Sequence, residues 1–245
     1  MNRLFYLCGF LLAGIALPLN AAVLQQQMAG VLAFEAESFS TLINGPTGSN
    51  FSIITTTSGV KPLPANTNAV GAAIYANRSG GAEDAFATYQ LAFTSNGTYN
   101  LYARYSFYEV STNTDYGQED SYYSPTAFGQ AATTTGSWSA EFLSFGGYHP
   151  TNNPNEGAFF LWDAGLSTYV ITGASEADPV MVTFTIRMRE GGTALDRFVL
   201  TTTPQTIANG LSSTLDAMVS VPEPGRAVMV MLGALGLVLV RRRSR

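Results

Sequence analysis

The sequence predicts an all-β protein, a β-sandwich of the jelly-roll kind, and three observations support this prediction. Apolar and polar residues alternate over short runs such as residues 99–105, which is the period of a half-buried strand. Turn residues separate these runs, and Ser95-Asn96-Gly97-Thr98, between two apolar runs, is a strong hairpin signal. Between the two ends of the chain, no stretch keeps the apolar period of a helix. Many short strands in succession are typical of sandwiches and jelly rolls.

The expected strands follow one another along the whole body of the chain. In order, they occupy residues 32–37, 51–55, 87–93, 99–105, 141–145, 158–162, 180–188 and 197–202. Two regions interrupt the pattern. Residues 44–70 are expected to form a long loop around the 51–55 strand, and residues 109–137 form a polar stretch too long for a passive connection, so we expect it to be functional or mobile. The domain should end at residue 203, and residues 204–220 are expected to be a polar linker.

Composition excludes two classes of protein. The chain is 46% hydrophobic and 12% aromatic, which is enough to bury a core, so intrinsic disorder is not expected. Residues 23–221 hold six basic side chains and 16 acidic ones. A chain with that balance repels a phosphate backbone, so nucleic-acid binding is not expected either.

The first 22 residues have the three parts of a secretory signal peptide. Arg3 precedes an apolar run from Leu4 to Leu19, and the small residues Ala21 and Ala22 follow it. A first membrane anchor is the alternative. The one cysteine of the chain, Cys8, lies inside this segment, so the mature protein would have neither a disulfide nor a catalytic thiol.

The last 25 residues combine a motif, a short apolar run and a basic end. Pro222-Glu223-Pro224 precedes the apolar run 227–240, and Arg241-Arg242-Arg243 follows it. As a helix, these 14 apolar residues would span about 21 Å, less than the roughly 30 Å of a hydrocarbon core. This arrangement is similar to the PEP-CTERM sorting signal of exported Gram-negative proteins. The resemblance implies a membrane helix that an exosortase recognises and cuts near Pro-Glu-Pro; an ordinary tail anchor is the alternative.

Three short segments define the frame of the predicted sandwich. They are Phe34-Glu35-Ala36-Glu37, then residues 87–91 with 97–105, and finally residues 187–201. In this order they are similar to the carbohydrate-binding modules of families six and thirty-five, which are galactose-binding-like β-jelly rolls. The resemblance spans residues 31–203 and implies sugar binding. It departs from these modules at residues 109–165, a stretch that is longer here.

Two glutamates open the predicted domain. Glu35 and Glu37 lie two residues apart on a strand, so both side chains project to the same face. The resemblance implies a structural calcium that joins the opening strand to the closing one. Carried over by position, its ligands would be Glu35, Glu37 and Asp196, with backbone carbonyls completing the oxygen shell. The alternative is that one glutamate pairs with Arg187, Arg189 or Arg197.

Candidate sugar-binding residues lie in the long middle region and beyond it. Sugars are bound by aromatic rings that stack on their C–H groups, with polar side chains that hydrogen-bond the hydroxyls. The candidates are Tyr116, Tyr122, Tyr123, Trp138, Tyr148 and Asn152. Tyr122 and Tyr123 have polar neighbours, so burial of both is not expected. Trp162, in an apolar run, is expected in the core.

Catalysis has little support in the sequence. His149 is the one histidine, it lies in a predicted turn, and no Gly-x-Ser-x-Gly motif is present. A carboxylate pair could hydrolyse a glycoside, for instance Glu119 or Asp120 with Glu141 or Asp163. Nothing in their spacing distinguishes these residues from solvated loop acids. We therefore expect no enzymatic activity.

The interpretation that follows is an exported, non-catalytic protein that binds polysaccharide. Its destination would be the envelope or extracellular matrix of a Gram-negative bacterium, and its ligand the exopolysaccharide of the producing cell, as in a biofilm. A structural matrix protein without a sugar site is one alternative, and a glycan-cleaving enzyme is another. The first two differ in whether the aromatic residues of 109–153 gather on one exposed face.

Overall fold

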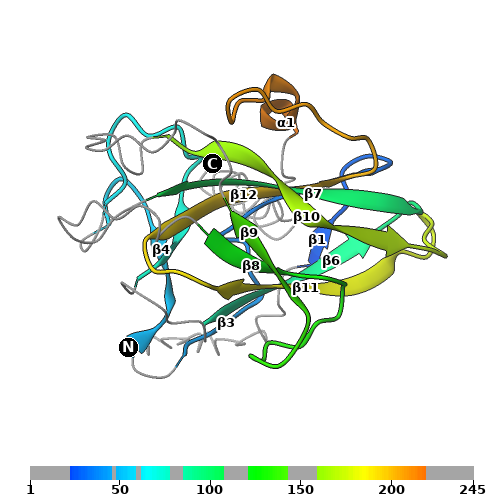
Figure 1. Cartoon of the computed structure of the whole chain (residues 1–245). Helices are drawn as coiled ribbons and strands as arrows, with labels where there is room; N and C mark the ends of the chain where they lie inside the picture. Colours follow the sequence, from blue (N-terminus) through cyan, green and yellow to red (C-terminus); the bar gives the residue numbers. More distant parts are fainter. Residues whose placement is uncertain are drawn as a thin grey trace, which may run out of the picture.

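The computed structural model describes residues 23–45, 48–58, 62–77, 85–107, 121–142 and 159–218. Its strands form two sheets that pack face to face (Figure 1). Sheet A contains, in spatial order, β1 (Val23–Gln25), β6 (Phe86–Phe93), β11 (Val180–Met188), β8 (Ser121–Pro125) and β9 (Trp138–Phe142), with β3 (Thr41–Ile43) also paired to β6. Sheet B contains β10 (Leu161–Ile171), β7 (Gly97–Phe107), β12 (Thr193–Thr201), β5 (Ala73–Ala76) and β4 (Phe51–Ile54), with β2 (Val31–Glu35) also paired to β12.

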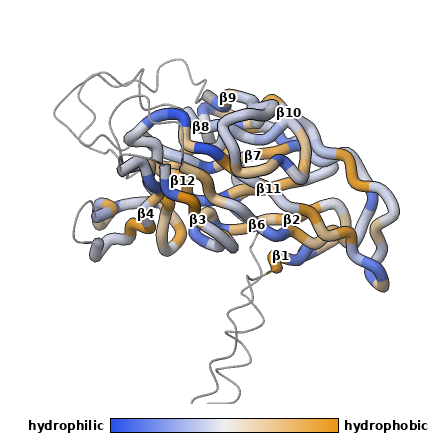
Figure 2. Tube along the Cα trace, turned by 90° about the horizontal axis from the view of Figure 1, so that it is seen from below, coloured by the Kyte–Doolittle hydropathy of each residue, from blue (hydrophilic) through white to orange (hydrophobic). Residues whose placement is uncertain are grey.

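This architecture confirms the prediction of an all-β sandwich. Strands β6, β7, β11 and β12 overlap the expected ranges, and β4 was expected inside the first long loop. Among the described strand pairs, every one is antiparallel except that of β1 with β6. Figure 2 shows hydrophobic positions along central strands such as β7 and β11, and hydrophilic ones toward the loops.

An aromatic cluster between the sheets forms the centre of the core. Phe198 of β12 stacks on Phe34 of β2 at 5.3 Å between ring centroids, and both belong to sheet B. From sheet A, Tyr89 lies 4.9 Å from Phe34, and Phe184 lies 5.9 Å from Phe198. The Tyr89 hydroxyl donates to the Ala36 carbonyl at 2.6 Å, so this buried phenol keeps a partner while it joins the two sheets.

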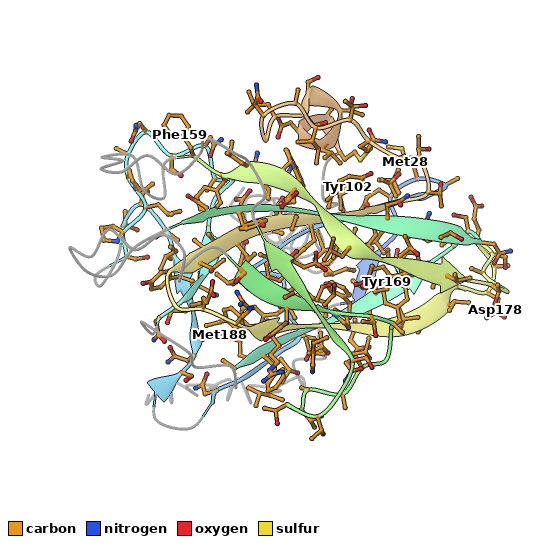
Figure 3. All side chains as sticks on the ribbon, in the orientation of Figure 1. Met28, Tyr102, Phe159, Tyr169, Asp178 and Met188 are labelled. Atoms are coloured by element: carbon orange, nitrogen blue, oxygen red, sulfur yellow. The ribbon has the colours of Figure 1, made fainter. Side chains whose placement is uncertain are left out.

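The chain after β12 does not leave the sandwich. Residues 204–218, here called the C-terminal segment, pack on the outer face of sheet B and end in helix α1 (Ser213–Ala217), which lies above that sheet in Figure 1. Leu215 is fully buried against Tyr102 and Trp162, and Figure 3 shows Tyr102 on the side of the sandwich that carries the helix. Asp216 of the same helix accepts hydrogen bonds from Arg104 at 3.0 Å and from the Trp162 indole at 2.8 Å. Residues 204–218 thus differ from the linker that we predicted, because apolar packing and these polar contacts together hold the segment on sheet B.

Candidate functional site

Two of the predicted sugar-binding residues come together on sheet A. Tyr123 of β8 pairs with Arg187 of β11, and Trp138 of β9 pairs with Pro125 of β8. The guanidinium carbon of Arg187 lies 5.0 Å from the ring centroid of Tyr123 and 5.9 Å from that of Trp138. Both distances are within the range of a cation–π contact, so Arg187 stands between the two rings and holds them.

Phe86 completes this arrangement from the neighbouring strand. It pairs with Arg187 in the β6–β11 ladder, and its ring centroid lies 5.9 Å from that of Trp138. We call Phe86, Tyr123, Trp138 and Arg187 the aromatic platform. Phe86 and Arg187 are buried and form its base, whereas Tyr123 and Trp138 are half-buried and reach the surface.

The strand period places the aromatic platform on the outer face of sheet A. Successive side chains of a strand point to opposite faces. Ala87, Tyr122 and Ile186, each next to a platform residue in sequence, belong to the core between the sheets. Their neighbours in the platform therefore point away from the core.

The loop between β8 and β9 orients Trp138. The indole nitrogen of Trp138 donates to the Thr133 carbonyl at 3.2 Å, and the Arg187 guanidinium donates to the Thr134 carbonyl at 3.5 Å. The Thr126 hydroxyl and the Ser137 carbonyl close the base of the loop at 3.1 Å. An aromatic ring fixed in this way loses little side-chain entropy when a ligand binds.

Polar side chains continue the same face along β6 and β11. The hydroxyls of Thr88 and Thr185 lie 3.3 Å apart, and the Gln90 amide donates to the Thr183 hydroxyl at 3.3 Å. Thr88, Gln90 and Thr183 are half-buried. Hydroxyl and amide groups of this kind hydrogen-bond the hydroxyls of sugars, and here they lie beside two half-buried rings.

The other predicted sugar-binding residues lie elsewhere. Tyr122 is 2% exposed and packs in the core against Tyr105, with 5.5 Å between centroids. Its assignment to a sugar site was wrong, because adjacent residues of one strand point to opposite faces and only Tyr123 is on the outer one. Tyr116, Tyr148 and Asn152 lie outside the described residues.

Neither Phe86 nor Arg187 was predicted as a site residue from the sequence. Arg187 lies in the expected 180–188 strand, and Phe86 lies one residue before the expected 87–93 strand. Each is followed or preceded by a core residue. Their outward orientation could have been deduced from the alternation of the strand. The pairing of β8 with β11 could not, because β8 was not expected as a strand.

The three predicted metal ligands do come close to one another, at the end of β2 and beside the bulge of β12. Two of them are bound to arginine. Arg197 donates to both oxygens of Glu35, at 2.6 and 3.2 Å. Arg104 of β7 donates to Asp196, with 2.6 Å between Nη2 and Oδ2. The alternative weighed for Glu35, an ion pair with Arg197, is thus present.

Glu37 differs from the other two acids because its Oε2 is buried and has no hydrogen-bond partner among the described residues. Burial, with a smaller contribution from the negative charges of Glu35 and Asp196, raises the pKa of Glu37 to about 8. Burial also raises the pKa of Asp196 to about 6, although Arg104 opposes this shift.

These contacts fit calcium poorly. The ion takes six to eight oxygen ligands, whereas only the Glu37 carboxylate offers an oxygen that neither an arginine nor a backbone N–H occupies. Within the described ranges, no group of three or more His, Cys, Asp or Glu side chains is arranged to hold a metal ion. Calcium at Glu35, Glu37 and Asp196 stays a prediction of the resemblance.

Of the acids considered for hydrolysis, Glu119 and Asp120 lie outside the described residues, so none of the predicted pairs can be followed. The other two acids, Glu141 and Asp163, lie near each other. Glu141 of β9 and Asp163 of β10 influence each other electrostatically where the two sheets meet at their edges. The Glu141 carboxylate accepts hydrogen bonds from the Ser124 hydroxyl and from the Leu166 amide, the latter at 2.9 Å. Glu141 is 3% exposed, and burial raises its pKa. Glu141 thus joins the two sheets, because Ser124 belongs to sheet A and Leu166 to sheet B.

The two ends of the chain lie outside the described residues. This applies to the predicted signal peptide, to Pro222, Glu223 and Pro224, and to the arginines at 241–243. In the part of the chain that is described, no helix has the length and apolar character needed to cross a bilayer.

Comparison with known proteins gives only distant likenesses. No protein-family model matches the chain, and no curated protein matches it. Among solved structures, the Podospora anserina GH26-CBM35 β-(1,4)-mannanase is 16% identical, with 73% of this chain and 29% of that chain covered and a TM-score of 0.37. The isomalto-dextranase of Arthrobacter globiformis T6, complexed with panose, is 14% identical over 71% of this chain and 23% of that chain, with a TM-score of 0.38.

A third match is of another kind. The mosquito-larvicidal Cry4Aa toxin from Bacillus thuringiensis is 11% identical over 75% of this chain and 25% of that chain, with a TM-score of 0.38. The present chain thus spans about a quarter of the length of each of these proteins. Likenesses at this level carry no argument about activity.

Proposed function

We propose that this protein binds polysaccharide, without cleaving it, on the outer face of sheet A. The observation that carries the proposal is the aromatic platform, in which Arg187 holds the rings of Tyr123 and Trp138 at 5.0 and 5.9 Å on one half-exposed surface. The rings offer faces to sugar C–H groups, and Thr88, Gln90 and Thr183 offer partners for the hydroxyls.

The shape of this face suits a chain better than a single sugar. A pleated sheet presents side chains of one face at regular intervals along and across its strands. The two half-exposed rings lie on β8 and β9, and the polar residues extend from them along β11 and β6. A polysaccharide laid across these strands would stack on the rings and hydrogen-bond farther along the sheet.

The experiment is isothermal titration of the full chain with a panel of neutral and acidic polysaccharides. For the glycan that binds, Tyr123→Ala and Trp138→Ala should each weaken binding at least about tenfold, which is roughly 1.4 kcal/mol. Phe159→Ala is the control, because Phe159 is also an aromatic residue that reaches the surface, at 43% exposed, but it lies just before β10 of sheet B.

The outcomes separate the proposal from its alternatives. Binding that both platform variants lose and the control keeps supports the proposed site. Binding that all three variants keep would move the site to another surface. A folded protein that binds none of the glycans would favour a structural matrix protein, and release of reducing ends would favour an enzyme.

The wider setting is part of the same proposal. The N-terminal 22 residues and the tail with Pro222-Glu223-Pro224 and its terminal arginines support export, processing by an exosortase, and delivery to the envelope or matrix of a Gram-negative cell. Exopolysaccharide is the polysaccharide that a matrix protein would meet there. Mass determination of the mature protein from the producing cell tests this part, because processing would remove both ends.

A further inference from the structure

The junction between the opening and closing strands of the sandwich is held by two arginines. Glu35 and Arg197 are register partners of β2 and β12. Their side chains form a two-pronged ion pair, with distances of 2.6 and 3.2 Å, and the side chains are only 15% and 5% exposed. Such bidentate pairs fix the geometry of both partners and are among the strongest charged hydrogen bonds in proteins.

The second arginine closes the same junction from β7. Asp196 lies in the bulge of β12 and is fully buried. Its Oδ2 receives Arg104 at 2.6 Å, and its Oδ1 receives the Val70 amide at 2.8 Å. The Asp196 carbonyl also accepts the Ala36 amide at 2.8 Å, directly between Glu35 and Glu37.

A divalent cation at this junction would compete with these contacts. A cation that bound Glu35 and Asp196 would have to displace both guanidinium groups. Arg197 would then be left buried without its carboxylate, and of its two carboxylate partners Arg104 would keep only the more exposed Asp216, at 3.0 Å, which is unfavourable. The positive charge that such a cation brings is already supplied by the side chains of the protein itself.

We propose that Arg197 and Arg104 take the place of the calcium ion that the resemblance to carbohydrate-binding modules implies, so that the β2–β12 junction is stable without metal. The guanidinium of Arg197 joins the opening strand to the closing one, which is the task of the ion in those modules. This inference concerns the stability of the fold, so it stands or falls independently of sugar binding on the opposite sheet.

The test is thermal unfolding of the full chain in excess chelator and in millimolar calcium, with magnesium at equal ionic strength as the reference. The wild-type Tm should be the same in all three solutions. Arg197→Gln should lower the Tm in chelator, because Glu35 then loses its partner beside Glu37. Calcium, but not magnesium, should restore part of that loss, because the freed Glu35 carboxylate and the neighbouring Glu37 then offer oxygens to a cation.

Two further proteins complete the test. Arg189→Gln is the matched control, because Arg189 pairs with Glu190 away from the junction, and its Tm should not respond to calcium. Arg197→Lys keeps the positive charge but not the planar guanidinium that hydrogen-bonds both oxygens of Glu35. Its Tm should therefore be lower than that of the wild type and should not change with calcium.

The proposal is overturned by either of two results. One is a wild-type Tm that rises in calcium and falls in chelator beyond the effect of magnesium. The other is an Arg197→Gln protein that folds but gains nothing from calcium, because the arginine would then not occupy a cation site. If that variant folds only when calcium is present, the proposal is supported; direct calcium titration of the wild type should in every case show no binding.

Discussion

Glu141 is an acid held where the two sheets meet. It is buried and accepts hydrogen bonds from Ser124 of sheet A and from the backbone of Leu166 in sheet B. Burial raises the pKa of Glu141 above its ordinary value of 4.5. The folded protein therefore keeps a proton at pH values where the unfolded chain has lost it. Unfolding releases that proton, so the free energy of unfolding falls as the pH rises above about 4.5.

We expect Glu141→Gln to remove this pH dependence. The amide has the shape of the acid, and its oxygen can still accept the Leu166 amide while its nitrogen donates to the Ser124 hydroxyl. The wild type and the variant should be equally stable near pH 4, and the variant should become the more stable one as the pH rises to 8. Urea unfolding at a series of pH values measures the difference.

An exposed acid provides the control for that series. Glu176 is exposed between β10 and β11, so Glu176→Gln makes the same exchange away from the junction of the two sheets and serves as the reference curve. Parallel curves for the wild type and Glu141→Gln would show that the buried carboxyl does not titrate differently in the two states.

Among the elements, the C-terminal segment has Leu215 as its most deeply buried side chain. Helix α1 has five residues, too few to be stable alone. Leu215→Ala should lower the free energy of unfolding by about 2–5 kcal/mol, because Leu215 is fully buried between Tyr102 and Trp162. Leu211 in the same segment is 60% exposed, so Leu211→Ala should cost less than about 0.5 kcal/mol. Denaturant titration compares the two; equal losses would mean that the segment is not packed as described.

The strands also show which elements a sequence pattern can predict and which it cannot. Strands such as β7 and β11 were predicted because their alternation is long and uninterrupted. β8 was missed because its five residues, with two serines and a proline, have the composition of a turn. β8 is held in the sheet because Tyr122 packs against the aromatic core, where its ring contacts Phe198. Such a tertiary contact cannot be predicted from the local sequence pattern.

At the scale of the whole molecule, the residues of the candidate site could be predicted from the sequence only in part. Tyr123 and Trp138 could be selected from the sequence because they are aromatic residues in a polar region. Their meeting depends on β8 pairing with both β9 and β11, which joins residues far apart in the chain. The ion pair of Glu35 with Arg197 was foreseen as one of several alternatives, but the register of β2 with β12 was needed to choose among them.

The two sheets should unfold as one cooperative unit, because the aromatic core and the tyrosine hydroxyls join them. Tyr89 of sheet A donates to Ala36, and Tyr169 of sheet B, which lies between the sheets in Figure 3, donates to Pro125 of sheet A at 2.6 Å. No large part of either sheet can separate without opening this core to water.

The two tryptophans of the chain allow this prediction to be tested, because each sheet carries one. Trp138 lies in sheet A and Trp162 in sheet B. In Trp162→Phe the fluorescence reports sheet A alone, and in Trp138→Phe it reports sheet B alone, while circular dichroism follows both sheets in each variant. Within each variant the two signals should give the same midpoint in guanidinium chloride. A fluorescence midpoint that differs from that of circular dichroism in either variant would show that one sheet unfolds before the other.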